Sequence, residues 1–309
     1  MSPDAARDRK RLGDWCAMVG PIVYEREPAR LPASTIDRLA VVSWNTHVGG
    51  GDLAALVDAV QRGDFTRGEP FAAVVLLLQE MYRHGGGVPE RPTILSAIPS
   101  RIIDALHGEH ARDVRRVASE RGLAVLYAPS MRNGAAADDP EDRGNAILST
   151  LPLSDPAAIE LPIERQRRVV AVAVVSGRTS TGAEWRLRLA NVHLDTALAL
   201  LHGGPLTARR RQVDALVASL TRSTFAGPTM VAGDFNTWLG EREPAIRALR
   251  AAFPDAPAPR YGPTWLGPLG LRATLDYVFA RGRARSIEVQ RLPSRFGSDH
   301  YPLLSVITF

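Results

Sequence analysis

Short apolar runs of strand length, each bordered by a polar side chain, constrain the fold of this chain more than any other feature of its sequence. VVSWN, LLLQE, LANVH and MVAGDFN finish in such residues, TLDYVF carries one near its start, and SDHYPLLSV begins with two. A charged group beside an apolar strand loses hydration, which costs several kcal/mol unless a metal or an opposite charge compensates. Six strands with this arrangement predict one shared polar centre. Its members are Asn45, Glu80, His193, Asp234, Asn236, Asp276, Asp299 and His300.

From Leu39 onward, apolar runs alternate with helical segments and loops rich in Gly and Pro, which indicates an α/β fold. The expected strands are 39–44, 72–78, 123–128, 146–149, 169–175, 185–193, 229–233, 274–280 and 302–309. The expected helices are 52–62, 98–118, 207–222 and 243–252, with Thr207 as the N-cap of the third. Residues 133–143 are expected to form a loop. Nothing resembles a linker after residue 39, so we predict an N-terminal extension over 1–38 and one domain over 39–309.

The composition is that of an ordinary globular protein, because 45% of the 309 residues are hydrophobic and 23% are charged. No apolar run approaches the roughly 20 residues that span a bilayer. The first eleven residues lack the apolar stretch of a secretory signal. Cys16 is the only cysteine, which excludes an intramolecular disulfide framework. These features favour a cytoplasmic protein without a membrane span.

The net charge of +5 has two interpretations. It can mark binding to a polyanion such as nucleic acid. It can also reflect a GC-rich genome, because Lys10 is the only lysine and every other basic residue is arginine. The arginines that precede a predicted strand or open a predicted helix could contact phosphates or only line a solvated face. They are Arg165, Arg167, Arg168 and residues 209–211.

The residue types of the predicted centre indicate its chemistry. Carboxylate and amide oxygens without a cysteine cluster favour a hard cation, so Mg²⁺ or Mn²⁺ is expected rather than zinc. The histidines add acid–base capacity or a cationic partner for a phosphorane-like transition state. This combination is typical of metal-assisted phosphoester hydrolysis.

Seven motifs in order resemble those of the endonuclease/exonuclease/phosphatase superfamily. That family includes pancreatic-type deoxyribonucleases, abasic-site endonucleases, neutral sphingomyelinases, inositol polyphosphate 5-phosphatases and poly(A) deadenylases. The resemblance runs from about residue 39 to the C-terminus, and GDxN followed by SDH is specific when QE precedes both. It implies a four-layer α/β sandwich of two packed mixed β-sheets with outer helices. The motifs are SWNT (43–46), LLQE (77–80), GNAILS (144–149), NVHLD (191–195), GDFN (233–236), LDYVF (275–279) and SDHYPL (298–303).

The resemblance implies a metal-binding part of the centre. Glu80 would bind the metal, with Asn45 beside it as a ligand or as the amide that orients the carboxylate. Asp299 would reach the metal directly or through water. His47 stands where some family members have an acidic residue that serves a second metal. A single Mg²⁺ is therefore expected.

The resemblance also implies roles in catalysis. Asp234 would orient or deprotonate the attacking water, and Asn236 would hold the phosphate or the nucleophile. His300 would bind the scissile phosphate or act as general base, with Asp276 fixing its tautomer. The last two residues would contact the phosphate: His193 would stabilise it or the leaving oxygen, and Asn145 would donate a hydrogen bond to it.

Three functions remain open from the sequence. The first is a nuclease on DNA or RNA, which the positive charge supports. The second is a phosphatase or phosphodiesterase on a small or lipid phosphoester, such as an inositol phosphate or sphingomyelin. The third is a non-catalytic scaffold on the same fold. A phosphoester substrate is the expected partner, and a monomer is the simplest expectation for the oligomeric state.

Overall fold

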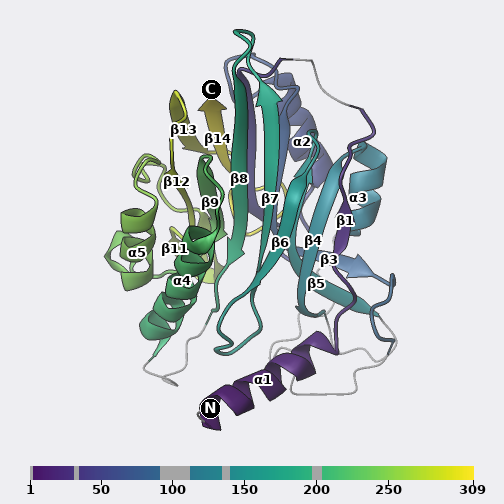
Figure 1. The fold of residues 1–309 in the computed structure, drawn as a ribbon, viewed down its shortest axis with the longest axis vertical. Helices are drawn as coiled ribbons and strands as arrows, with labels where there is room; N and C mark the ends of the chain where they lie inside the picture. The colour runs from purple at the N-terminus through teal and green to yellow at the C-terminus, as the bar shows by residue number, and fades with distance from the viewer. Residues whose placement is uncertain (1–2, 31–34, 91–111, 134–139, 197–203) are drawn as a thin grey trace.

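The computed structural model describes residues 3–30, 35–90, 112–133, 140–196 and 204–309. Most strands belong to two large sheets (Figure 1). The seven-stranded sheet has the order β1-β4-β5-β3-β2-β14-β13. Its strands are β1 (Val23–Glu25), β2 (Arg38–Asn45), β3 (Val74–His84), β4 (Ala124–Arg132), β5 (Glu141–Ser149), β13 (Ser286–Arg291) and β14 (Leu303–Thr308).

The five-stranded sheet has the order β12-β9-β8-β7-β6. Its strands are β6 (Ser154–Glu160), β7 (Val169–Arg178), β8 (Glu184–His193), β9 (Thr229–Asp234) and β12 (Asp276–Arg281). Both sheets are mixed, because β2 pairs with β3 and β8 with β9 in parallel, whereas the other pairs are antiparallel. A short ribbon of β10 (Trp265–Leu266) and β11 (Arg272–Ala273) stands apart from them.

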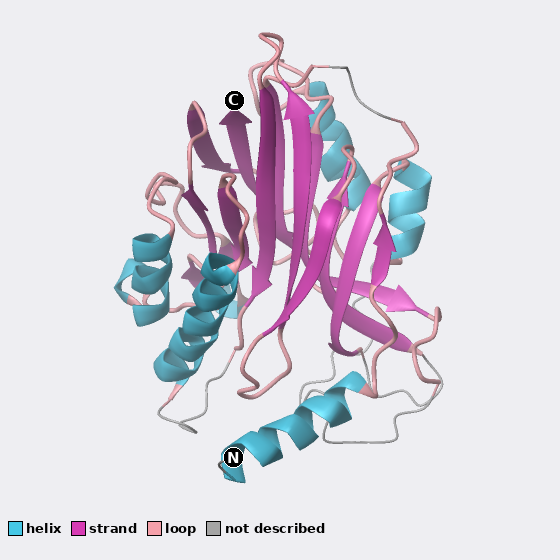
Figure 2. Cartoon of the chain, in the orientation of Figure 1, coloured by secondary structure: helices cyan, strands magenta, loops and turns pink. Residues whose placement is uncertain are grey.

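Helices cover the outer face of each sheet, which completes four layers (Figure 2). The helices α2 (Leu53–Arg62) and α3 (Val114–Arg121) lie on the seven-stranded sheet, and α4 (Pro205–Arg222) and α5 (Pro244–Ala252) lie on the five-stranded sheet. Two short 3₁₀ helices are also present: Gly240–Arg242 precedes α5, and Pro268–Gly270 precedes β11. This architecture confirms the predicted four-layer α/β sandwich.

Three apolar layers hold the sandwich together. Between the sheets, Leu77 and Leu189 belong to one buried cluster drawn from both sheets. Leu56 of α2 packs on the outer face of the seven-stranded sheet. Leu216 of α4 packs against Phe235 on the outer face of the five-stranded sheet. The strands between these layers are buried on both faces, so their sequences are continuous apolar runs rather than alternating ones.

The N-terminal residues pack on the rest of the molecule. Helix α1 (Pro3–Cys16) is followed by β1, which pairs with β4 at the edge of the seven-stranded sheet. Trp15 and Met18 form a small buried cluster with Met131 and Ile163. Residues 3–25, predicted as an extension, therefore share a hydrophobic contact and a sheet with the domain.

Some predicted elements differ from the structure. Helix α4 begins at Pro205 after Gly204, so Thr207 is not its N-cap, and a proline at the first helical position replaces a side-chain cap. Residues 98–111 of the expected helix 98–118 lie outside the described residues, and α3 begins at Val114. Residues 141–143 of the expected loop belong to β5. No described helix is long and apolar enough to cross a membrane.

Candidate active site

The site lies where neighbouring strands of the two sheets finish. The register of the five-stranded sheet places His193 opposite Asp234 and Asp234 opposite Asp276. In the other sheet, the last residue of β2, Asn45, lies opposite Gln79 of β3. Parallel strands bring their carboxyl ends to the same edge, so residues distant in sequence meet in one place.

A cleft of about 400 Å³ opens at this edge. Seven of the nine predicted site residues line it, and an eighth, Asp276, contacts the lining residue His300. The lining residues are Asn45, His47, Glu80, Arg143, Arg165, Gln166, Arg168, His193, Thr196, Asp234, Asn236, Trp238, Trp265, Leu275, Asp299 and His300.

Asp234 is the centre of the polar cluster. Its Oδ2 accepts a hydrogen bond of 3.0 Å from Asn45 Nδ2, and its Oδ1 accepts one of 2.9 Å from the backbone N–H of Asn236. The same Oδ2 lies 3.5 Å from His193 Nε2 and 3.7 Å from His300 Nε2. Both histidine rings therefore direct a nitrogen at one carboxylate.

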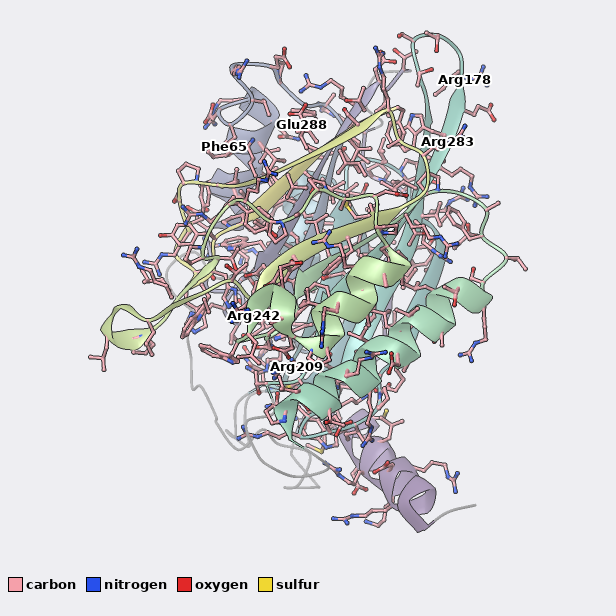
Figure 3. All side chains as sticks on the ribbon, turned by 90° about the vertical axis from the view of Figure 1, so that its left-hand side faces the viewer. Phe65, Arg178, Arg209, Arg242, Arg283 and Glu288 are labelled. Carbon is pink, nitrogen blue, oxygen red and sulfur yellow. The ribbon has the colours of Figure 1, made fainter. Side chains whose placement is uncertain are left out.

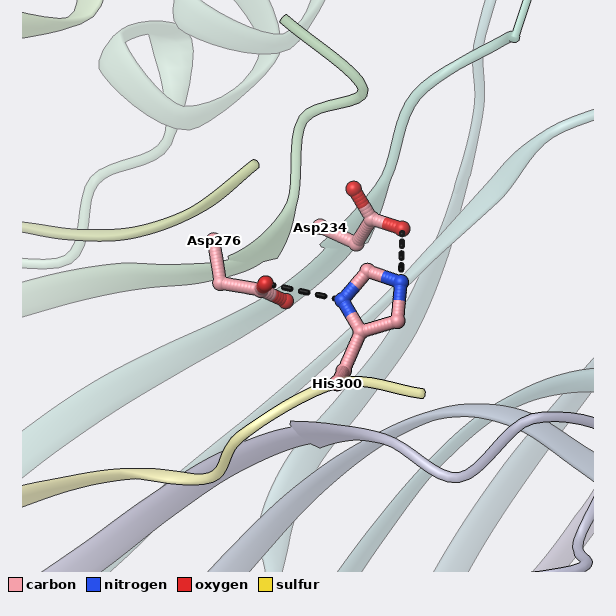
Figure 4. Close-up of side chains that lie close together, drawn as sticks. All are labelled: Asp234, Asp276 and His300. Carbon is pink, nitrogen blue, oxygen red and sulfur yellow. Dashed lines mark hydrogen bonds and ion pairs between the residues drawn. The ribbon is translucent and has the colours of Figure 1, made fainter. Parts of the chain in front are cut away.

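His300 is held between two carboxylates (Figure 4). Its Nδ1 donates to Asp276 Oδ2 over 2.8 Å, while Nε2 faces Asp234. The backbone positions both partners, because Thr264 Oγ1 accepts from the N–H of Asp276 and Ser298 Oγ accepts from the N–H of His300. A ring fixed at Nδ1 in this way presents Nε2 to the cleft.

The electrostatics of the centre follow from these contacts. Burial raises the pKa of Asp234 to about 7, against the lowering effect of His300. Burial alone would lower the pKa of His300, but the carboxylates of Asp276 and Asp234 raise it to about 10. Burial lowers the pKa of His193 well below its usual value, and nearby Arg168 adds to this. At neutral pH one histidine is thus cationic and the other neutral.

Two site residues have left-handed backbones. Glu80 has φ of 56° and falls where the register of β3 against β5 shifts, between Leu78 and Met81. Asn236 has φ of 50° directly after β9. Such conformations are unfavourable for residues other than glycine, and β-bulges redirect side chains next to active sites. The bulge explains how the side chain of Glu80, within an otherwise buried strand, reaches the cleft.

The donor set fits a hard divalent cation. Among the described residues, the Glu80 carboxylate makes no hydrogen bond, and the basic nitrogen that lies within 4.0 Å of it is His193 Nε2, at 3.9 Å. Asp299 lines the same cleft, with Trp265 Nε1 donating to its Oδ2 over 2.9 Å. His47 Nδ1 lies 3.7 Å from Asp299 Oδ1. A histidine at this position supplies no carboxylate for a second metal. An acidic group without a donor partner suits Mg²⁺, which prefers carboxylate oxygens and water.

A second group of possible ligands is closer together. One ligand atom each of Asp234, Asp276 and His300 lie within 4.8 Å of one another. However, His300 Nδ1 is engaged by Asp276 and carries a proton there, so this nitrogen is not free for a cation.

Asn145 does not line the cleft. Its Nδ2 donates to the backbone carbonyls of Val169 and Asn191, over 2.8 and 3.3 Å. Asn191 in turn donates to the carbonyls of Leu78 and Ala146, and Gln79 donates to its Oδ1. These buried amides join the two sheets directly behind the site, and the sequence did not single out Gln79 or Asn191 for this role.

A buried acid shapes one wall of the cleft. Asp195 Oδ2 accepts from the backbone N–H groups of Arg165 and Gln166, over 2.7 and 2.8 Å. The side chain of Gln166 then accepts from Arg168 Nη2. Sequence reasoning missed Arg143, which follows no strand end, and left the role of Arg168 open.

The fold and the site define a class of protein: a two-sheet α/β sandwich with acids, amides and histidines gathered at one end, which is a phosphoesterase fold. The sequence profile of the Endonuclease/Exonuclease/phosphatase family matches residues 42–300. The chain therefore belongs to this family. No sequence among curated proteins matches the chain.

Solved structures share the fold at low sequence identity. An endonuclease/exonuclease/phosphatase from Beutenbergia cavernae has a TM-score of 0.57 and 18% identity, over 89% of this chain and 72% of that one. The human Nocturnin catalytic domain, which holds a sulfate anion, has a TM-score of 0.51 and 17% identity, over 94% and 97%. Sphingomyelinase C from Streptomyces griseocarneus has a TM-score of 0.51 and 20% identity, over 88% and 99%.

Proposed function

We propose that this chain is a Mg²⁺-dependent phosphodiesterase that hydrolyses the backbone of DNA or RNA. The observation that carries the proposal is the convergence of His193 and His300 on Asp234, in a cleft that also holds Glu80 and Asp299. This arrangement supplies a base, a cationic donor and acidic oxygens for a cation within one cavity. Each is a component of metal-assisted phosphoester hydrolysis.

Asp234 aligns and deprotonates the attacking water. A pKa of about 7 is close to the operating pH, where a general base combines availability with proton affinity. Asn45 and the backbone N–H of Asn236 occupy one lone pair on each oxygen, which fixes the carboxylate plane. The amide of Asn236 is fixed by its bond to the Leu194 carbonyl.

The two histidines stabilise the phosphorane-like transition state. His300 presents a protonated Nε2 to the non-bridging oxygens, and Asp276 keeps it charged and oriented. His193 stays neutral and contacts the phosphate or the leaving oxygen. Glu80, Asp299 and Asn45 would hold Mg²⁺ or Mn²⁺, which would supply further charge neutralisation for the phosphate.

A nucleic-acid substrate is favoured by the net positive charge and by a pair of aromatic rings at the cleft. Trp238 and Trp265 meet edge to face, with ring centroids 5.3 Å apart. Trp238 is also 47% exposed, so a base can stack on it.

A lipid phosphodiester is the second candidate, because apolar side chains border the same cleft. Among the described residues, six large hydrophobic side chains are exposed, and four of them are on the two segments that flank the site. Exposed apolar side chains near a cleft suit an apolar ligand. These four are Trp238, Leu239, Leu269 and Leu271.

The test is a panel of substrates with and without Mg²⁺: plasmid DNA, single-stranded DNA, RNA, inositol phosphates and sphingomyelin vesicles. We expect hydrolysis of nucleic acid that EDTA abolishes and that Mg²⁺ or Mn²⁺ restores. Affinity for DNA should fall steeply as the salt concentration rises. Preferred turnover of sphingomyelin would select the second candidate. Activity that persists in EDTA, or no turnover of any phosphoester, would contradict the proposed chemistry.

A further inference from the structure

Buried arginines divide into three groups by their partners. Seven arginines are buried in the described part of the chain. Three of them pair with carboxylates, Arg83 with Asp142, Arg167 with Glu160 and Arg209 with Glu243. Arg132 donates to the carbonyls of Pro89 and Glu90, and Arg188 to Thr229 and the Leu220 carbonyl. The remaining two are Arg143 and Arg168.

Arg143 and Arg168 have no carboxylate partner. Within the described residues, Arg143 makes no ion pair and no side-chain hydrogen bond, and its Nε is buried without a partner. Arg168 makes one hydrogen bond to a neutral group, Gln166 Oε1 at 2.9 Å, and its Nε is likewise unpartnered. They are only 9% and 5% exposed. A buried guanidinium without an anion is unfavourable by several kcal/mol, and two of them add mutual repulsion.

Both guanidinium groups line the catalytic cleft beside Glu80 and His193. Their positive charge acts on the centre, because both contribute to the lowered pKa of His193. The carboxylates of Asp195 and Glu80 act on Arg168 only from beyond ion-pair distance. The uncompensated charge therefore faces a cavity that remains large enough for an anionic group.

The wall that carries Arg168 is built before any ligand arrives. Asp195, which is fully buried, holds the backbone of Arg165 and Gln166, and Gln166 orients the guanidinium. Gln212 fixes Asp195 in turn by accepting from its N–H over 3.0 Å. Preorganised donors of this kind bind an anion without a further entropic cost for ordering side chains.

We propose that Arg143 and Arg168 form a second anion subsite, which binds a phosphoryl group of the substrate adjacent to the phosphorus under attack. This inference rests on the proposed function and narrows its substrate class to molecules with two neighbouring phosphoryl groups. Guanidinium groups suit such an anion because they can bind two of its oxygens at once. The second group is either the next phosphate of a nucleic-acid strand or a neighbouring phosphate in a small diphosphate or bisphosphate.

The experiment compares ligands that differ by one phosphoryl group. Binding is measured by isothermal titration calorimetry on the full chain with Mg²⁺, in an Asp234→Asn background that slows hydrolysis. One arm compares the dinucleotide TpT with pTpT, and the other compares orthophosphate with imidodiphosphate. We expect the added group to raise affinity about tenfold to a hundredfold in at least one arm. A gain only in the first arm identifies a strand, and a gain only in the second identifies a diphosphate.

Arg143→Gln and Arg168→Gln should each remove at least about tenfold of this gain, while the affinity for the smaller ligand changes less than about threefold. Arg178→Gln is the matched control. Arg178 lies at the far end of β7 from Arg168, where it is exposed and pairs with Glu184 (Figure 3). The control substitution therefore removes the same charge at a distance from the cleft. Its variant should keep the full gain.

Thermal unfolding separates binding from structure. Because each substitution removes an uncompensated buried charge, both glutamine variants should have the parent's Tm or a higher one. If a glutamine variant does not fold, Arg→Lys at that position replaces it, and we expect a loss of about threefold to tenfold. An undiminished gain in the folded variants, or no gain in either arm for the parent, overturns the subsite.

The two proposals fail in different ways. If the wild-type chain hydrolyses no phosphoester with Mg²⁺, the proposed function fails, and the binding comparison still decides the subsite. If hydrolysis is intact but the arginine variants keep the gain, only the subsite fails.

Discussion

The hydrogen bond from His300 Nδ1 to Asp276 Oδ2 supports a quantitative prediction for Asp276→Asn. The contact is 2.8 Å long and both side chains are buried, so water screens it weakly. Two unit charges about 4 Å apart attract by about 4 kcal/mol at an effective dielectric constant of about 20. About 1.4 kcal/mol corresponds to a factor of ten. The substitution should therefore lower kcat by about a thousandfold, because His300 loses the charge that stabilises its imidazolium in the transition state.

The folded state should tolerate this change, because His300, unlike an arginine, can release its proton when the charge of Asp276 is removed. Asn has the shape of Asp, and Asp276 Oδ1 has no hydrogen-bond partner among the described residues, so no bond is lost there. Kinetics with bis(p-nitrophenyl) phosphate and Mg²⁺, together with thermal unfolding, test both parts. Asp255→Asn is the control, since it removes the same charge from an exposed residue whose carboxylate accepts from Gly282.

Two results would refute this reasoning. A loss of kcat below about tenfold at an unchanged Tm would show that Asp276 does not tune His300 in the reaction. A loss of activity that follows a similar fall in Tm, or one that Asp255→Asn reproduces, would assign the effect to folding or to net charge.

Three further substitutions test separate parts of the structure. Asp234→Ala should lower turnover by about 10²–10⁴-fold at an unchanged or higher Tm, and near-wild-type rates would refute its role as base. Trp265→Phe removes the donor to Asp299, so the Mg²⁺ concentration for half-maximal activity should rise about tenfold or more; an unchanged Mg²⁺ titration would contradict this. Glu243→Gln leaves Arg209 on α4 without its buried partner (Figure 3) and should lower the free energy of unfolding in urea by about 3–5 kcal/mol. The control Glu241→Gln, at a half-exposed residue, should lower it by under about 1 kcal/mol. Equal losses would show that burial of the pair is irrelevant.

The strands that carry the site could be predicted because they are central. The strands β2, β3, β8, β9 and β14 are buried along nearly their whole length, and each has an apolar run bordered at one end by a polar residue that enters the cleft. The desolvation cost of that polar residue is a local property of the sequence. Eight of the nine predicted residues, all except Asn145, meet at one place, and they could be predicted without knowledge of the strand order.

Three of the four edge strands of the two large sheets, β1, β6 and β13, escaped prediction for a physical reason. The strand β6 contains Pro156 and is largely exposed, and β13 alternates between exposed and half-buried residues. Both lie at the edge of a sheet, where charge and proline are tolerated and no continuous apolar run is required. The strand β1 has only three residues, too few to show a period.

The arginines mark the limit of local reasoning. Whether a guanidinium is structural or ready for a ligand depends on which carboxylate the fold brings to it, and the neighbours Arg167 and Arg168 show this directly. Arg167 pairs with Glu160, while Arg168 finds only the amide of Gln166. Because arginines occur throughout the chain, composition cannot separate the two. The unpaired charge becomes visible only when the partners of every buried guanidinium are known, and only then does it support the proposal of an anion subsite.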